Sequence, residues 1–231
     1  MINRLRKNRK QRKGFTLIEL LISIVLFTIF LGLVSQSYVS IVRAQRQANE
    51  VRKLYSDVRV FMDVLAEDIR LSSIDYNCYT VSFFDTGLDD ICDSEVRSQI
   101  TAGESDTLAL LKKGGVERTA YKVFTDINTG EKILKVKRWF KDKPTDFAWK
   151  PVAGYEDFLP VFSEKMVVDH VSFAILPEVD PYSSEYYTDN AVQFQPKVTT
   201  FLSVRSAEVA NVDFDYQFQT TISSRVYSRE I

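Results

Sequence analysis

The sequence contains a single histidine, His170, and this scarcity excludes much metal chemistry. A zinc-peptidase motif of the H-E-x-x-H type, or any site built from several imidazoles, needs more than one. The chain also lacks a G-x-S-x-G nucleophile motif, a Walker loop and a G-x-G-x-x-G phosphate-binding pattern. His170 stands alone in an extended pattern, where we expect a surface or structural residue. We therefore predict that the chain is not an enzyme and has no catalytic residue.

Acidic residues are absent from positions 1–14, which carry seven Lys or Arg residues. The whole chain has 30 basic and 31 acidic residues, so loss of this leader would leave 23 basic against 31 acidic residues and a net charge of about −8. A net negative surface has no general attraction for nucleic acid or anionic lipid. We therefore expect no nucleic-acid partner.

Charged residues are also scarce in the next 20 positions, 15–34, where Glu19 is the only one. At about 1.5 Å per residue this apolar run would extend about 30 Å as a helix, the thickness of the hydrocarbon core of a bilayer. By the positive-inside rule, the basic leader keeps the N-terminus in the cytoplasm and places the remainder outside. No A-x-A cleavage pattern follows the run, so a conventional secretory signal is not indicated. The sequence predicts a single-pass protein of the cytoplasmic membrane.

Residues 13–21, KGFTLIELL, resemble the type III signal sequence of type IV pilins and type II secretion pseudopilins. In that family a membrane-embedded prepilin peptidase cleaves after the glycine and methylates the new N-terminal residue. The resemblance implies removal of residues 1–14 by cleavage between Gly14 and Phe15, and N-methylation of Phe15. It also implies that Glu19 neutralises the N-terminal amine of a neighbouring subunit, because a buried carboxylate is tolerable beside an opposite charge.

The segment 35–74 continues this apolar run as an amphipathic helix, because it contains no Pro or Gly and its apolar residues recur every three or four positions. These apolar residues are Val51, Leu54, Tyr55, Val58, Phe61, Leu65 and Ile69. The charged residues expected largely off this stripe are Arg52, Lys53, Asp57, Arg59, Asp63 and Asp68. The stripe predicts that this half of the helix packs on a sheet.

Beyond residue 75 the periodicity changes toward two, which is typical of strands. The strands are expected at 107–111, 118–124, 132–139, 166–176, 196–204 and 214–223. Residues 126–130, DINTG, predict a hairpin turn between the second and third of them. The predicted fold is α+β: a long N-terminal helix packed on antiparallel sheet, with residues 75–231 as an extracytoplasmic β domain.

Two cysteines, Cys78 and Cys92, follow the membrane segment and are 14 positions apart. In an exported domain their natural state is an intramolecular disulfide, which at this loop length would contribute about 3 kcal/mol. A metal site is the weaker alternative, since two thiols and the distant His170 make a poor ligand set.

Acidic clusters give weak candidates for calcium. Asp85, Asp89 and Asp90 offer oxygen ligands at short spacing, and residues 126–131 do so to a smaller extent. Neither cluster has the terminal glutamate that a full EF-hand loop requires, and Asp or Asn beside Gly is ordinary turn chemistry. We therefore predict no metal site and no cofactor, with calcium at the first cluster as the alternative.

The order of the strands resembles that of the larger minor subunits of the pilin family, the J-type minor pseudopilin and the W-type minor pilin. The segments that carry this resemblance are 118–139 and 159–173. It implies two small antiparallel sheets after the helix. It also implies a minor subunit that joins or initiates a type IV pilus or a type II secretion pseudopilus.

The partners implied are other pilin or pseudopilin subunits, prepilin peptidase and the assembly platform of the inner membrane. Within the family, a major pilin is the alternative. A different class of protein, a signal-anchored ligand-binding or adhesin domain, would leave Glu19 and the Gly14–Phe15 junction unexplained. A tip adhesin or DNA-uptake subunit is compatible with the minor role.

Overall fold

A computed structural model gives the structure of the chain. It describes residues 14–81, 92, 96–101, 103–112, 114–127, 130–146, 148–163, 166–181, 195–206 and 215–225. The chain divides into two compact units, residues 1–49 and residues 50–231, which are taken in turn.

One helix, α1 (Leu17–Arg70), contributes to both units. Within the first unit its apolar side chains, from Leu17 to Val34, are exposed. Among the described residues, α1 is the one helix with the length and composition to cross a membrane. An apolar helix surface of this kind is stable in lipid or against other apolar helices and unfavourable in water. These properties fit a single-pass membrane anchor.

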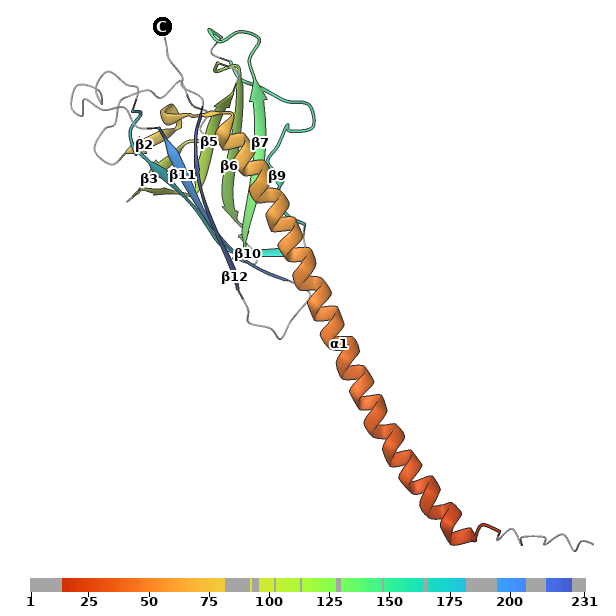
Figure 1. Ribbon diagram of the computed structural model, residues 1–231. Coiled ribbons are helices and arrows are strands. Elements are labelled where there is room, and N and C mark those ends of the chain that lie inside the picture. The colour runs from red at the N-terminus through yellow and green to blue at the C-terminus, as the bar shows by residue number, and fades with distance from the viewer. Residues whose placement is uncertain are drawn as a thin grey trace, which may run out of the picture. The chain divides into compact units, whose positions relative to one another are not determined.

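In the second unit, α1 packs on the sheet through one face (Figure 1). The buried apolar residues of this face are Leu54, Val58, Phe61, Leu65 and Ile69, at spacings of three or four. The ring of Phe61 meets those of Tyr121 and Phe162 edge to face, with centroids 6.1 and 5.1 Å apart. Such pairs add about 0.5–1.5 kcal/mol beyond the area they bury. The predicted stripe is confirmed as core at these five positions, whereas its other two members differ: Val51 is half-buried and Tyr55 is exposed.

The prediction that Asp68 lies off this face is wrong. Asp68 is 5 % exposed, whereas Asp57, which likewise follows a buried leucine by three residues, is exposed, so helix spacing alone does not explain its burial. Its carboxylate pairs with the Lys112 ammonium and accepts a hydrogen bond of 2.6 Å from the Tyr121 hydroxyl. Burial and the Asp68 charge raise the pKa of Tyr121, which therefore stays a neutral donor. A buried charge is tolerated here because its partners neutralise it.

The helix ends earlier than the sequence indicated, at Arg70 and not near Ile74. Ser73 and Ile74 form a short strand, β1 (Ser73–Ile74), whose partners across the ladder are Leu111 and Leu110. The Ser72 hydroxyl donates to the carbonyl of Asp68 and satisfies one of the last helix acceptors. The helix ends without a Gly or Pro, because the pairing of β1 with β5 (Thr107–Lys112) ends it.

The remaining elements follow in chain order. They are η1 (Tyr76–Cys78), β2 (Tyr79–Val81), β3 (Ser98–Ile100), β4 (Glu104–Ser105), β5 (Thr107–Lys112), β6 (Glu117–Thr125), β7 (Lys132–Phe140), β8 (Lys150–Pro151), β9 (Leu159–Pro160), β10 (Met166–Leu176), β11 (Lys197–Ser206) and β12 (Tyr216–Ser223). All six predicted strands are present, as β5, β6, β7, β10, β11 and β12, and the α+β fold is confirmed.

The main sheet has the order β1-β5-β6-β7-β10-β11-β12, and all its pairs are antiparallel (Figure 1). Strands β8 and β9 also pair with β7, and β4 pairs with β10. A single residue pair, Lys132 with Val168, joins β7 to β10. The sheet therefore consists of two antiparallel halves with a narrow junction, where the resemblance implied two separate sheets. The helix touches both halves, since Phe61 meets Tyr121 on β6 and Tyr55 meets Phe218 on β12.

The predicted turn between β6 and β7 is confirmed as a hairpin. The backbone N–H groups of Asp126 and Gly130 donate to the carbonyls of Glu131 and Asp126, both at 2.8 Å. Gly130 has φ +71°, a left-handed conformation in which glycine carries no penalty from a Cβ. The backbone atoms of this acidic segment thus serve turn formation.

The expectation of a purely antiparallel β domain needs one correction. Strands β2 and β3 form a separate two-stranded sheet and run parallel, with Tyr79 opposite Ser98 and Val81 opposite Ile100. A parallel pair requires a crossover of about a dozen residues or more, and residues 82–97 are long enough to provide one.

Candidate functional site

The N-terminus of α1 is closed by a reciprocal pair of hydrogen bonds. The backbone N–H and the hydroxyl of Thr16 donate to Oε2 of Glu19, at 3.3 and 3.2 Å. The backbone N–H of Glu19 donates to Oγ1 of Thr16 at 3.4 Å. This is a capping box, which satisfies helix N–H groups that have no partner within the helix.

Glu19 therefore has a role inside its own chain that the sequence analysis did not assign. The signal was present as Thr16-x-x-Glu19, the spacing of a capping box. A carboxylate in the first turn also interacts favourably with the positive end of the helix dipole. Gly14 and Phe15 directly precede this cap, and both are exposed. The structure thus places Gly14, Phe15 and Glu19 within one short accessible segment.

The predicted disulfide is present. Sγ of Cys78 and Sγ of Cys92 are bonded, and the two Cα atoms are 5.2 Å apart. Both cysteines are buried in the core, and Cys78 is the last residue of η1, directly before β2. The disulfide fixes the segment that follows the helix and is a structural crosslink.

We expect the loss of this crosslink to reduce stability. A Cys78→Ala/Cys92→Ala variant should have a free energy of unfolding about 3 kcal/mol below that of the wild type, because the unfolded chain regains the freedom of a 14-residue loop. Chemical denaturation of the full chain in detergent measures this difference. Wild-type protein treated with reductant is the control, and its free energy of unfolding should fall by a similar amount. Equal stability of the oxidised wild type and the variant would contradict the prediction.

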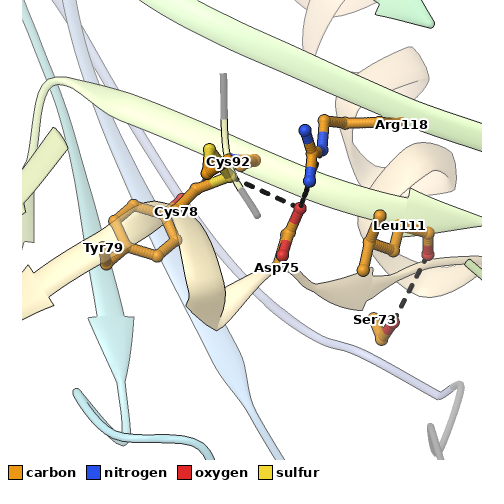
Figure 2. Close-up of polar contacts among 8 residues, drawn as sticks. Ser73, Asp75, Cys78, Tyr79, Cys92, Leu111 and Arg118 are labelled. Atoms are coloured by element: carbon orange, nitrogen blue, oxygen red, sulfur yellow. Dashed lines mark hydrogen bonds and ion pairs between the residues drawn. A yellow bond between two sulfur atoms is a disulfide. The ribbon is translucent and has the colours of Figure 1, made fainter. Parts of the chain in front are cut away.

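A buried ion pair lies beside the disulfide (Figure 2). The guanidinium of Arg118 contacts Oδ2 of Asp75 through Nε at 2.8 Å and through Nη2 at 2.7 Å. Sγ of Cys78 lies 3.4 Å from the same oxygen. Asp75 and Arg118 are 1 % and 2 % exposed, and the ring of Trp149 lies 4.1 Å from the guanidinium carbon.

The environment of Asp75 acts on its pKa in two directions. Burial raises the pKa above its ordinary value, and the charge and hydrogen bonds of Arg118 oppose this increase. Oδ1 of Asp75 is buried and accepts no hydrogen bond from the described residues. Arg118 is the group that does most to lower the pKa of Asp75, and the charge of Lys141 adds to its effect.

None of these groups forms a catalytic constellation in the part of the chain that the structure describes. The described residues contain no group of three or more His, Cys, Asp or Glu that could hold a metal ion. The weak calcium candidates Asp85, Asp89 and Asp90 lie outside the described residues, and calcium there stays a prediction. His170 is exposed on β10.

The decisive comparison concerns the segment that contains Gly14, Phe15 and Glu19. Residues 9–35 match the family model of the prokaryotic N-terminal methylation motif. The motif supports a prepilin-type signal and, with the exposed apolar half of α1, a membrane-anchored structural subunit of the pilin or pseudopilin kind. Residues 36–231, and with them the whole β domain, lie outside the match. Comparison of the chain with curated proteins and with solved structures gave no significant match.

Proposed function

We propose that the chain is a minor pilin or minor pseudopilin, a structural subunit that assembles through its N-terminal helix into a type IV pilus or a type II secretion pseudopilus. The observation that carries this proposal is the methylation motif over residues 9–35. Prepilin peptidase cleaves between Gly14 and Phe15 and methylates the new N-terminus. The mature chain then begins two residues before α1, so the charged amine lies next to the capping box.

The proposed assembly follows from the two halves of α1. The apolar half is exposed in the single chain and would be covered first by lipid and then by the helices of neighbouring subunits. Within the second unit, the other half packs on the β domain through its buried face and through Asp68. The partners of the chain are other subunits, prepilin peptidase and the inner-membrane assembly platform.

The β domain supports a minor role. In the second unit, the described residues form ten strands in the main sheet and two in a second sheet. A shaft subunit is repeated many times and favours a small, regular surface, whereas a subunit present in few copies at the tip has no such restriction. Abundance of the chain in sheared fibres distinguishes the two, and we expect a low ratio to the major subunit.

The first test is mass spectrometry of the intact N-terminus, with membranes from cells that have or lack prepilin peptidase. A chain that begins at N-methyl-Phe15, found only with the peptidase, supports the proposal. A chain that retains residues 1–14 in both samples would overturn it and indicate a signal-anchored ectodomain. No cofactor forms part of the proposal.

Two variants separate the roles of Glu19. Glu19→Gln keeps an acceptor for the capping box and removes the charge, so we expect normal cleavage and an unchanged helix. Incorporation into fibres should fall at least about tenfold, because the amine of a neighbouring subunit would be left unpaired. Thr16→Val removes the cap and keeps the charge, so incorporation should remain near wild type. Immunoblots of sheared fibres measure both. Equal incorporation of Glu19→Gln and wild type would contradict the assigned role.

A further inference from the structure

In the half-sheet β10-β11-β12 (Figure 1), the face that points away from the core, its outer face, carries polar residues that the proposed function does not use. The ladder register places residues in rows across the three strands. One row contains His170, Ser203 and Gln217. The next contains Ser172, Phe201 and Gln219. Since side chains alternate between faces, Val171 and Leu202 between these rows point into the core, where they are 5 % and 1 % exposed.

A β-bulge in β10 adds a carboxylate to this face. The register with β11 shifts between Val168 and His170, so Asp169 is an extra residue on its strand. A bulge re-aims side chains, and here both Asp169 and His170 border the same cavity. Nε of Arg205 donates to Oδ1 of Asp169 at 3.0 Å. Oδ2 of Asp169 is buried and accepts no hydrogen bond within the described part of the chain.

These residues surround a cavity of 640 Å³ within the second unit. This volume lies in the range of small-molecule sites and suits a ligand of two or three sugar rings. Its lining combines the amides of Gln217 and Gln219, the carboxylates of Glu104 and Asp215, and the ring of Phe201. Amides and carboxylates offer the donors and acceptors that hydroxyl groups require, and an aromatic ring offers an apolar surface for the C–H face of a pyranose.

We infer that this cavity binds a neutral saccharide. Charge decides against an anionic ligand, because carboxylates border the cavity and the neighbouring Arg205 is already paired with Asp169 and lies 3.9 Å from Glu131. Among the described residues no group of three or more His, Cys, Asp or Glu could hold a metal ion, so a metal ion is not the ligand proposed. The inference is independent of cleavage at Gly14, since all the residues that line the cavity lie in the second unit.

The test measures binding to the full chain reconstituted in nanodiscs by isothermal titration. The probes are cellohexaose and chitohexaose as neutral saccharides, hexagalacturonate as an anionic one and hexalysine as a cation. We expect a neutral probe to bind with a Kd below about 10 mM and hexagalacturonate to bind at least about tenfold more weakly. Phe201→Ala and the double variant Gln217→Ala/Gln219→Ala should each weaken binding at least about tenfold.

Ile127→Ala is the matched control, because Ile127 is an apolar side chain that is 98 % exposed and lies at the β6–β7 hairpin, outside this cavity. It should bind like the wild type. If Phe201→Ala fails to fold, the double glutamine variant still tests the site, since Gln217 and Gln219 are exposed. The inference is overturned if neither neutral probe binds, if hexagalacturonate or hexalysine binds as tightly as they do, or if the variants bind unchanged.

Discussion

Gly14→Val is expected to abolish processing, so that the membrane-inserted chain retains residues 1–14 and carries no methyl group on Phe15. The physical reason is the fit of the peptidase around the scissile bond, where glycine presents no Cβ and adopts backbone conformations closed to valine. Within the chain itself, a Cβ built at Gly14 meets no atom within 4 Å. The substitution therefore leaves the fold intact, and the loss reports recognition by the peptidase. Mass spectrometry of the intact protein measures the processed fraction.

Gly32→Ala is the control for this prediction. Gly32 lies inside the apolar half of α1, and a Cβ there also meets no atom within 4 Å. Alanine is the better helix former by about 1 kcal/mol, so the helix and its insertion should be preserved. We expect complete processing of Gly32→Ala. Processing of Gly14→Val at the wild-type level would place the cleavage site elsewhere and contradict the assignment of Gly14 and Phe15.

Arg118→Met is expected to lower the free energy of unfolding by about 3–5 kcal/mol at pH 7, because it leaves the buried carboxylate of Asp75 without its cation. The contact of Arg118 with Trp149 is lost as well. Methionine preserves much of the apolar volume, so the loss reports charge more than packing. Chemical denaturation of the full chain in detergent, followed by the fluorescence of Trp139 and Trp149, gives the value.

The stability lost in Arg118→Met should depend on pH in a defined direction. Burial already raises the pKa of Asp75, and removal of Arg118 removes the main influence that lowers it. A carboxyl whose folded-state pKa is raised above its unfolded value contributes stability at low pH and loses it as the pH rises through the folded-state pKa. Arg118→Met should therefore lose less stability at pH 5 than at pH 7. A loss that is equal at both pH values would contradict the role assigned to the pair.

The double variant Asp75→Asn/Arg118→Met is the matched control. It removes both charges together and leaves no uncompensated ion in the core, so we expect it to recover most of the stability lost in Arg118→Met. It should also lose the pH dependence, since residue 75 no longer titrates. A double variant as unstable as Arg118→Met would show that the shape of the arginine, and not its charge, stabilises this region.

Local patterns predicted the parts of the molecule in which neighbours in sequence are also neighbours in space. The spacing of Leu54, Val58 and Phe61 sets one helix face, and the DINTG segment at 126–130 forms its hairpin from its own backbone. The candidate site at Gly14, Phe15 and Glu19 could also be predicted from local pattern, because a signal sequence is recognised as a short continuous segment. Its capping box through Thr16 was equally local and equally visible.

The ion pairs could not be predicted in this way. Asp75 and Arg118 are 43 positions apart, and Asp68 and Lys112 are 44 apart. No local pattern distinguishes these aspartates from the exposed Asp57 and Asp63 on the same stretch of chain. Whether a carboxylate is buried depends on where its cation arrives after the sheet has formed, and this is a property of the register between strands.

The sequence by itself determined the membrane helix, the processing signal, the six principal strands and the cysteine pair, because composition and periodicity act over a few residues. Only the tertiary structure decided that α1 ends at Arg70, that Asp68 and Asp75 are buried, that β2 and β3 run parallel and that the register between β10 and β11 shifts at Asp169. Each of these outcomes requires a partner from a distant segment: Leu111 for the helix end, Arg118 for Asp75. The energy of such a contact exists only once both segments are in place.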